Sequence, residues 1–557
     1  MYKLKSEYMT ITKYFKVASL LALAGIAGCT KLTESYKTTI PATEAARSIS
    51  PSLLLQQAYN DIPGPFVGQS NVYSLEENST DESLVPTRGG DWDDNGVWRV
   101  IHNHSWNADH QQVIDVFNGL NGLNFDATNV LNFKPTPEQA AEAKFLRALS
   151  LFYLLDIYDQ FPFRNPGDTL LNAPKVYFGI DGCDFIINEL NTLIPDLADG
   201  NSKTQANKDA ANMLLMKLYL NRGAYKNRAT PTFDDADMQK VITLGKAIIA
   251  SGKYTAMPNY FQNFTYSNGN STEGIFMFPG ASGVSTNNPG MNARWMNGFH
   301  YNEYNGQAPN AGWNGFTTTS DFYNSFSLGG TTDYSLADTL IDSRIGRRLS
   351  SDPTTTKASG IRPGFLVGQQ FDQNGVPLKD RKGNPLAFTP DIAPTMIETG
   401  SNLEVTGIRV CKYVPDFSDA SGKYYSSNPG NWFNMFRYPD VVLMTAEALM
   451  RQATPDNTAA IALVNAVRTA RGASTVTTLP LGPSANAHSL VDDPNCLLAE
   501  RGRELYLESS RRTDLIRFGV YLTPWQYKPT DDPKYLLFPV PNQALAVNPN
   551  LKHNPGY

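Results

Sequence analysis

The stretch that decides the fold is "EQAAEAKFLRALSLFYLLDIYDQF", residues 138–161. Its large apolar side chains recur at the three- and four-residue spacing of one helix face, which predicts a long helix with a buried side. Pro137 stands directly before it, at a position that the first turn of a helix tolerates. The residues that define the buried side are Phe145, Leu149, Phe152 and Tyr153.

Further helices of 12 to 20 residues are predicted on both sides of this stretch. They are expected at 207–225, 235–254, 438–452, 457–473 and 495–512. Gly223 and Gly252 are expected to close the first two. Short loops join several of them, which favours antiparallel pairs. Close approach within the pairs is favoured by the small residues Ala446, Ala448 and Ala466. Stacked pairs of this length predict a tetratricopeptide-like scaffold.

The middle of the chain, residues 256–435, has a different composition. It is rich in Asn, Gly, Ser and Thr and is interrupted by Pro. Long loops inside a compact protein usually carry function. Short strands are expected within it at 274–279 and 407–415. The sequence therefore predicts a mainly α protein, in which a helical scaffold holds a large loop-rich insert with short β-strands.

The N-terminus predicts export and lipid attachment. Lysines precede an apolar run at 17–26, which is too short to cross a bilayer but suits a secretory signal peptide. The run ends in "IAGC" (26–29), which resembles a bacterial lipobox and implies cleavage before Cys29 and lipid on its thiol. The alternative is an ordinary signal peptide followed by a chance Cys. Three cysteines remain, too few and too far apart for a disulfide framework: Cys183, Cys411 and Cys496.

Composition narrows the range of ligands. The net charge is −6 and no basic patch stands out, so nucleic acid is not expected as a partner. The chain has 27 Tyr, 28 Phe and 7 Trp, which favours a surface that stacks on flat ligands, although most single rings in proteins pack in cores.

Four stretches then carry a resemblance to a known family. The helix at 141–163 is similar to its E-A-x-F-L-R-A-x-x-x-F-x-L helix, and "AGWNGFTTTSDFYNSF" (311–326) with "DSRIGRR" (342–348) is similar to its G-W…D-x-R segment. "FRYPDVVLMTAEALMR" (436–451) is similar to its R-Y-A-D-V-L-L-M-Y-A-E-A-L helix. "LLAERGRELYLESSRRTDLIRFG" and the ending "HNPGY" resemble its C-terminal motifs. On these motifs the chain resembles the SusD/RagB family of outer-membrane lipoproteins from Bacteroidota.

The resemblance implies a tetratricopeptide-like α scaffold that displays an irregular ligand face. Members of the family are not enzymes. They act as lids on a SusC-like TonB-dependent outer-membrane transporter and deliver an oligosaccharide to it, or a peptide in the RagB branch. The implied division of the chain is a signal peptide (1–28), an N-terminal helical region with an early ligand loop (29–255), a ligand-face insert (256–435) and a C-terminal helical region that completes the scaffold (436–557).

Two windows combine flat rings with polar side chains, as sugar binding requires. The first is "RGGDWDDNGVWRV" (88–100) and the second is "RWMNGFHYNEYNGQAPNAGW" (294–313). Trp313 belongs to the Gly-Trp pair of the family motif, so a structural role is the alternative to ligand contact for this residue. The candidate ligand-binding residues are Trp92, Asp94, Trp98, Trp295, Tyr301, Tyr304 and Trp313.

Other chemistries receive less support. A helical row of Glu500, Glu504 and Glu508 among arginines is interpreted as structural ion pairs, because a glycosidase needs two carboxylates across a sugar ring. The spacing of His102 and its neighbours at 104 and 110 does not fit zinc. "DWDDNG" (91–96) resembles a calcium loop without its terminal Glu, so calcium is left open and no other cofactor is expected. A peptide-binding protein and a lipid-anchored glycoside hydrolase remain the alternative functions.

Overall fold

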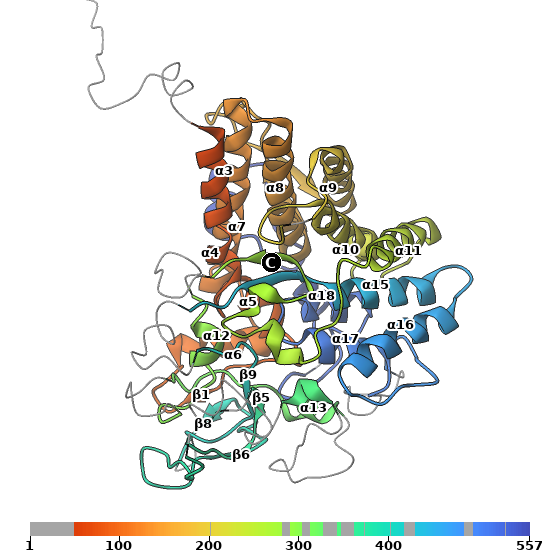
Figure 1. Cartoon of the computed structure of the whole chain (residues 1–557). Helices are drawn as coiled ribbons and strands as arrows, with labels where there is room; N and C mark the ends of the chain where they lie inside the picture. Colours follow the sequence, from red (N-terminus) through yellow and green to blue (C-terminus); the bar gives the residue numbers. More distant parts are fainter. Residues whose placement is uncertain are drawn as a thin grey trace, which may run out of the picture. The chain divides into compact units, whose positions relative to one another are not determined.

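The helix predicted at 138–161 is α8, Pro137–Tyr158 (Figure 1). Thr136 caps it in a capping box, because its side chain accepts from the Gln139 backbone N–H while the Gln139 side chain accepts from the Thr136 N–H. Nearly every residue from Ala141 onward is buried, so the prediction of a single buried side was too narrow. A helix that is buried all round lies inside a protein rather than on its surface.

The computed structural model describes residues 50–557 apart from 201, 281–289, 304–311, 327–341, 347–360, 362, 373, 401–402, 417–428, 484–493 and 530. The predicted signal peptide, Cys29 and Tyr304 lie outside the described residues. Residues Ser50–Tyr557 form one structural unit. No described helix is long and apolar enough to cross a membrane.

Long helices make up the scaffold around α8. They are α3 (Pro51–Asn60), α7 (Gln111–Val130), α9 (Gly179–Leu193), α10 (Lys208–Lys226), α11 (Asp235–Ala250), α15 (Tyr438–Arg451) and α16 (Asn457–Ala470). The shorter helices are α4 (Pro63–Phe66), α5 (Val72–Glu77), α6 (Val97–His102), α12 (Ala293–Met296), α13 (Ser320–Asn324), α17 (Leu497–Leu505), α18 (Arg511–Arg517) and α19 (Asn542–Val547).

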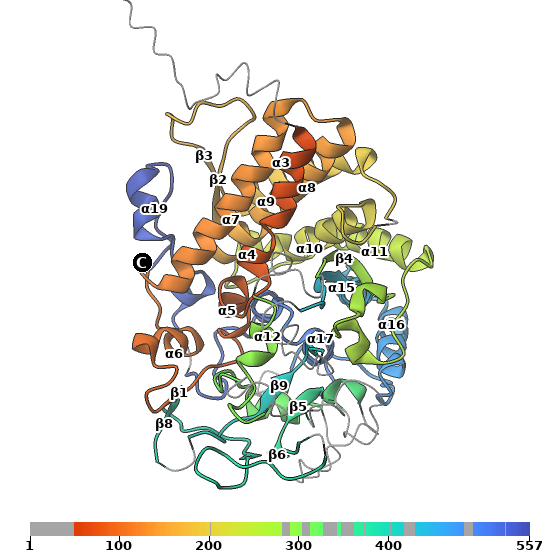
Figure 2. The ribbon, with the colours of Figure 1, turned by 60° about the vertical axis from the view of Figure 1, so that its left-hand side comes forward.

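The long helices stack in series, which confirms the predicted helical-pair scaffold. α7 packs on α8, α8 on α9, α9 on α10, α10 on α11, α11 on α15 and α15 on α16 (Figures 1 and 2). The chain leaves the stack after α11 and returns at α15, and those two helices pack directly on each other. Gly245 permits this contact, since a Cβ there would lie 1.9 Å from Oγ1 of Thr445.

The two predicted glycine caps behave differently. Gly252 follows α11 with φ of +66°, as predicted for a helix end. Gly223, in contrast, lies inside α10, which continues to Lys226. A Cβ at position 223 would stand 1.6 Å from the backbone oxygen of Thr232, so this glycine serves a close backbone approach and not a cap.

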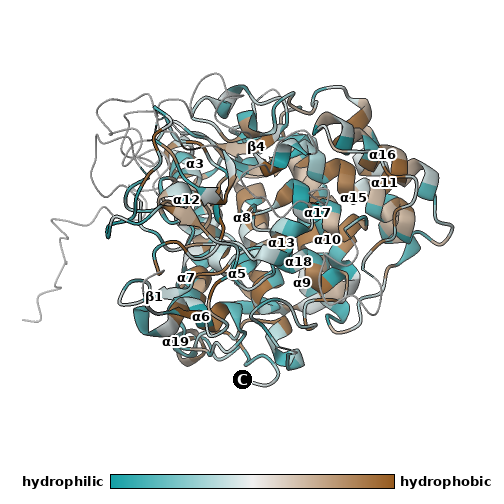
Figure 3. Ribbon diagram, turned by 90° about the horizontal axis from the view of Figure 1, so that it is seen from below, coloured by the Kyte–Doolittle hydropathy of each residue, from teal (hydrophilic) through white to brown (hydrophobic). Residues whose placement is uncertain are grey.

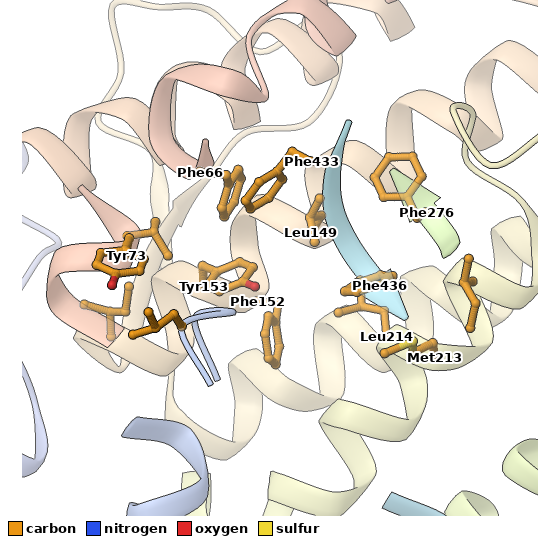
Figure 4. Close-up of a cluster of buried hydrophobic side chains, with 14 of the residues drawn as sticks. Phe66, Tyr73, Leu149, Phe152, Tyr153, Met213, Leu214, Phe276, Phe433 and Phe436 are labelled. Atoms are coloured by element: carbon orange, nitrogen blue, oxygen red, sulfur yellow. The ribbon is translucent and has the colours of Figure 1, made fainter. Parts of the chain in front are cut away.

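One continuous apolar core joins the scaffold to the insert. Figure 3 shows the apolar residues concentrated on the stacked helices, with hydrophilic residues in the loops. Figure 4 shows rings from α4, α5 and α8 meeting rings from two strands of the insert's base. The labelled residues of this cluster are Phe66, Tyr73, Leu149, Phe152, Tyr153, Met213, Leu214, Phe276, Phe433 and Phe436.

The strands are short and pair two by two. They are β1 (Thr87–Arg88), β2 (Gln160–Phe163), β3 (Lys175–Phe178), β4 (Gly274–Phe278), β5 (Gly364–Leu366), β6 (Gly368–Gln369), β7 (Ala387–Phe388), β8 (Ile397–Glu398), β9 (Arg409–Cys411) and β10 (Phe433–Arg437). β1 pairs with β8 in parallel, whereas β2–β3, β4–β10, β5–β9 and β6–β7 are antiparallel. The strand predicted at 274–279 is β4, and only part of the one predicted at 407–415 forms, as β9. Because β4 and β10 pair, they close the base of the insert.

The C-terminal helix predicted over 495–512 is interrupted. α17 ends at Leu505, and α18 begins only at Arg511. Between them, buried carboxylates bind backbone groups instead: Glu82 accepts from the Leu507 N–H at 3.0 Å and Glu77 from the Ser510 N–H at 3.2 Å. Those bonds replace the intrahelical ones, so the chain turns where helical spacing alone predicts continuation.

The glutamates of this segment form buried ion pairs, as predicted. Glu504 lies at the centre and contacts Arg344 at 3.2 Å, Arg437 at 3.0 Å and Arg471 at 2.7 Å. Burial by itself would raise the pKa of Glu504, but Arg471 and Arg437 lower it to about 2, so the carboxylate is charged at any physiological pH. All three partners come from elsewhere in the chain: Arg344 belongs to the insert, Arg437 to β10 and Arg471 to the end of α16.

Removing the charge of Glu504 should therefore destabilise the protein strongly. We expect Glu504→Gln to lower the free energy of unfolding by about 3–5 kcal/mol, because it leaves three buried guanidinium groups under-compensated. Urea denaturation followed by circular dichroism measures this. The matched control is Asp199→Asn, which breaks an exposed pair to Lys208 and should leave the midpoint close to that of the wild type. Equal midpoints for both variants would contradict the role given to the buried network.

Candidate ligand-binding face

The early loop that holds the first window is conformationally strained. Trp92 (φ 59°), Asp94 (φ 39°) and Asn95 (φ 56°) all have positive φ angles in one short segment. Residues other than glycine seldom adopt this conformation, and such residues cluster at functional sites because the surrounding structure must hold them there at a cost of about 1–3 kcal/mol each. The loop leads directly into α6, which carries Trp98.

The structure brings the two predicted windows together. The Trp92 Nε1–H donates to the Trp313 carbonyl at 2.7 Å, and the Tyr301 hydroxyl donates to Oδ2 of Asp91 at 2.6 Å. Burial and the Asp91 carboxylate both raise the pKa of Tyr301, so its hydroxyl stays protonated and can donate. Residues more than 200 positions apart in the chain therefore form one surface, which we call the aromatic face: Trp92, Trp98, Tyr301 and Trp313.

The rings of this face pack edge to face. The Trp92 ring centroid lies 5.9 Å from that of Trp98 and 5.5 Å from that of Phe316, and Trp98 lies 5.4 Å from Phe316. Phe316 is buried and forms the base on which the two indoles rest. Gly315 makes room for them, since a Cβ there would stand 2.2 Å from the Trp92 ring. The indoles are thus fixed in place before any ligand arrives.

Polar groups border the rings. The Trp98 Nε1–H donates to Oδ2 of Asp94 at 2.8 Å, and Asp93 pairs with Arg99 at 3.1 Å. With Asp91 bound to Tyr301, each of the three carboxylates contacts a different protein group. Among the described residues, no three His, Cys, Asp or Glu side chains gather as a metal site would require. Calcium binding at 91–96 therefore stays an open prediction.

The candidate residues differ in exposure. Trp313 is 40% exposed, Asp94 is exposed, and Trp92, Trp98 and Tyr301 are partly exposed. Trp295, in contrast, is fully buried on α12, which packs against β9. Its ring has no face open to a ligand, so it belongs to the core and we leave it out of the aromatic face.

Sequence reasoning missed Arg381 and the groups that hold it. Its guanidinium lies 3.9 Å from the centre of the Tyr301 ring, and its Nε donates to Glu404 at 2.7 Å. Glu404 also binds Nε2 of His300 at 2.9 Å, and burial lowers the pKa of that histidine to about 4. Arg381 therefore covers one side of Tyr301. It lies in a turn of the insert with no recognisable motif, so only the fold reveals the contact.

Two buried arginines support the face from beneath. Arg88 donates to the backbone oxygens of Leu403 and Thr406, and Arg409 donates to the Thr406 oxygen and to Oδ1 of Asn314. Burial lowers the pKa of Arg88 to about 10, partly offset by Glu398. Asn314 is the neighbour of Trp313, so these bonds fix the second window against β1 and the turn at 403–407.

The histidines near the early loop make ordinary hydrogen bonds, as predicted. His102 contacts the backbone oxygens of Ser83 and Gln526, and His104 contacts Asp531 at 2.5 Å and the Ser79 oxygen at 2.9 Å. Nε2 of His110 contacts the Val97 oxygen at 2.9 Å.

Comparison with known proteins places the chain in a family. The SusD family model matches residues 272–557, just over half of the chain, so the protein belongs to the SusD family. Over 523 residues it is 25% identical to the starch-binding protein SusD of Bacteroides thetaiotaomicron, covering 89% of this chain and 88% of that protein. A SusD-like protein of Bacteroides ovatus is 25% identical over 173 residues, 31% of each chain.

Solved structures share the fold. A SusD superfamily protein from Parabacteroides distasonis superposes with a TM-score of 0.65 at 18% identity, covering 91% of this chain and 98% of that one. A laminarin-binding SusD-like protein gives 0.62 at 20% identity, with 91% and 99% covered. These likenesses confirm the predicted SusD-like α architecture.

The packing of Trp92 on Gly315 can be tested directly. We expect Gly315→Ala to displace the Trp92 ring, which would lower the melting temperature and change the tryptophan fluorescence spectrum. Gly90→Ala is the matched control, because a Cβ there meets nothing within 4 Å. If Gly315→Ala kept the wild-type spectrum and melting temperature, the ring would not rest on this glycine.

Glu303, a buried residue close to Tyr301 in the chain, gives the stability of the protein a pH dependence. Burial raises the pKa of this carboxyl to about 8, and its Oε2 accepts from the His300 N–H at 2.7 Å. The folded state therefore keeps a proton that the unfolded state loses above about pH 4.5, so wild-type stability falls from there to about pH 8. Glu303→Gln has no such proton. We expect its melting temperature, relative to the wild type, to rise between pH 5 and pH 8, as measured by differential scanning fluorimetry. A constant difference would contradict a neutral buried Glu303.

Proposed function

We propose that this protein is a glycan-binding outer-membrane lipoprotein that captures oligosaccharides on the aromatic face and delivers them to a SusC-like TonB-dependent transporter. The observation that carries the proposal is the convergence of the two windows. Partly exposed indole and phenol rings, held rigidly and bordered by carboxylates, suit the flat apolar sides and hydroxyl groups of sugar rings. Cys29 would anchor the protein through its lipid.

The relatives support a carbohydrate ligand. One relative's name is starch-binding protein, and similar structures include a laminarin-binding protein and a surface glycan-binding protein from Bacteroides thetaiotaomicron in complex with laminarihexaose.

A peptide ligand is the second candidate. Peptides commonly bind by adding a strand to an exposed sheet edge. The described strands around the face, β1 and β8, are two residues long and already pair with each other. They offer little edge to a peptide, so the observations favour a glycan.

The proposal is one of binding without hydrolysis. A glycosidase needs two carboxyl groups about 5–10 Å apart across the scissile bond, one of them free to give up a proton. Asp91, Asp93 and Asp94 each contact a tyrosine, an arginine or a tryptophan, and Glu500 and Glu504 are enclosed by arginines. These contacts occupy the carboxylates in structural roles.

Isothermal titration of residues 30–557 against a panel of plant, microbial and host glycans tests the proposal. We expect binding that weakens about tenfold in Trp98→Ala and in Trp313→Ala, because central aromatic anchors dominate such sites. Val547→Ala, an exposed apolar change on α19, is the control and should bind normally. Thin-layer chromatography of the same mixtures should show intact glycan. Breakdown products, or binding of peptide pools in place of glycans, would overturn the proposal.

A further inference from the structure

A cavity of about 190 Å³ lies between α7 and the loop that joins β2 to β3. It is far from the aromatic face. The part of α7 that lines the cavity begins at Asn121, in the second half of the helix. α6, which carries Trp98, lies instead beside the first turn of α7, where His110 contacts Val97. The rise of 1.5 Å per residue separates Phe125 from that first turn by roughly 20 Å. Figure 2 shows β2 and β3 at one end of α7 and β1 and α6 at the other.

One side of the cavity is a row of amides. Asn121, Asn124 and Asn132 lie at helical spacing on a single side of α7 and the turn that follows it, with Thr128 between them. Asparagine is a weak helix former, so propensity does not account for this row. An amide both donates and accepts hydrogen bonds, and so does each hydroxyl of a sugar.

The protein's own hydrogen bonds do not use every donor and acceptor of these asparagine side chains. Nδ2 of Asn121 donates to the Phe117 oxygen at 2.8 Å, but its Oδ1 is buried without a hydrogen-bond partner. Nδ2 of Asn124 donates to the Pro162 oxygen at 3.1 Å. A buried acceptor left unsatisfied is unfavourable, and a rotation of the Asn121 side chain toward the cavity would let a ligand hydroxyl satisfy it.

Apolar groups supply the rest of the lining. Phe125 and Leu170 are 51% and 67% exposed, so they lie at the open side of the cavity, whereas Phe163 is buried. The charged groups at the rim are engaged locally: Arg164 donates to the Thr169 oxygen, and Asp168 accepts from the Asn165 N–H. Each of these charged groups already has a partner within the loop, which favours a neutral ligand.

The volume limits the ligand to one ring. Drug-sized ligands fill pockets of about 300–1,000 Å³, so this cavity takes a single ring or chain end at a time. We propose that it is a second carbohydrate site, which takes one neutral pyranose ring against Phe125 and the asparagine row. The choice of sugar as the probe rests on the proposed function, but the site itself shares no residue with the aromatic face.

A second site changes how the protein holds a long glycan. A chain that reaches both sites binds the second one intramolecularly, so its retention exceeds that of either site alone. A short oligosaccharide cannot gain in this way. It should simply bind twice to each protein molecule.

The test is isothermal titration with laminarihexaose and maltohexaose on four proteins. They are the wild type, the Trp98→Ala/Trp313→Ala double variant, that double variant with Phe125→Ala added, and the double variant with Leu171→Ala added. Leu171 is 95% exposed, is not part of the cavity lining and neighbours Leu170, so it is the matched control. Phe125 is half exposed on a helix, so its removal leaves the core intact, which circular dichroism checks.

We expect the wild type to bind two molecules per chain and the double variant one. Adding Phe125→Ala should weaken that remaining site about tenfold, and adding Leu171→Ala should leave it unchanged. Loss of all binding in the double variant would overturn the second site and leave the proposed function standing. Binding that depends on Phe125 alone would support the cavity and overturn the aromatic face. A wild type silent to both sugars would overturn this proposal.

Discussion

The buried carboxylate of Glu504 is the constraint on which the rest of the structure depends. It pairs with three guanidinium groups that arrive from the insert, from β10 and from the end of α16. Two of these, Arg437 and Arg471, also pair with Glu273, the residue directly before β4. A buried charge cluster is stable only when all members are present, because removing one leaves the others desolvated and unpaired. The helical scaffold and the insert both supply charged groups to this cluster, so its ion pairs hold the two parts together.

A second set of buried contacts lies at the start of the segment that leads to the aromatic face. Arg511 of α18 binds Asp81 at 2.6 Å, and Glu82 holds the Leu507 backbone in the turn between α17 and α18. The segment that follows Glu82 becomes β1 and then the strained loop with Trp92. Buried contacts therefore hold the start of the segment that carries the rings. Rigid rings lose little freedom on binding, which is why a preorganised face is an effective one.

Much of the scaffold could be predicted, because its signals are local. The helical spacing around Leu149, the place of Pro137 in the first turn and the strand at 274–279 are all properties of short stretches. The predictions fail where tertiary contacts decide the outcome. Gly223 is predicted to end a helix but serves a close backbone approach, and the predicted helix at 495–512 breaks because buried carboxylates bind its backbone.

The candidate site is predictable only in part, for the same reason. Composition indicates both windows, since Trp92 and Trp313 stand among polar residues, but their contact spans 221 positions and no periodicity reveals it. Trp295 has similar neighbours in sequence and is buried because α12 packs against β9. Arg381 carries no sequence signal at all. The asparagine row of α7 escapes prediction because asparagine-rich stretches favour a loop interpretation over a helix.

A crystal structure with a bound neutral oligosaccharide tests the central claim most directly. The account predicts sugar rings against Trp98 and Trp313, with hydroxyl groups near Asp94 and with the indoles in the positions they hold without ligand. Sugar density confined to other surfaces, or an aromatic face that rearranges to bury its rings when the ligand binds, would contradict it.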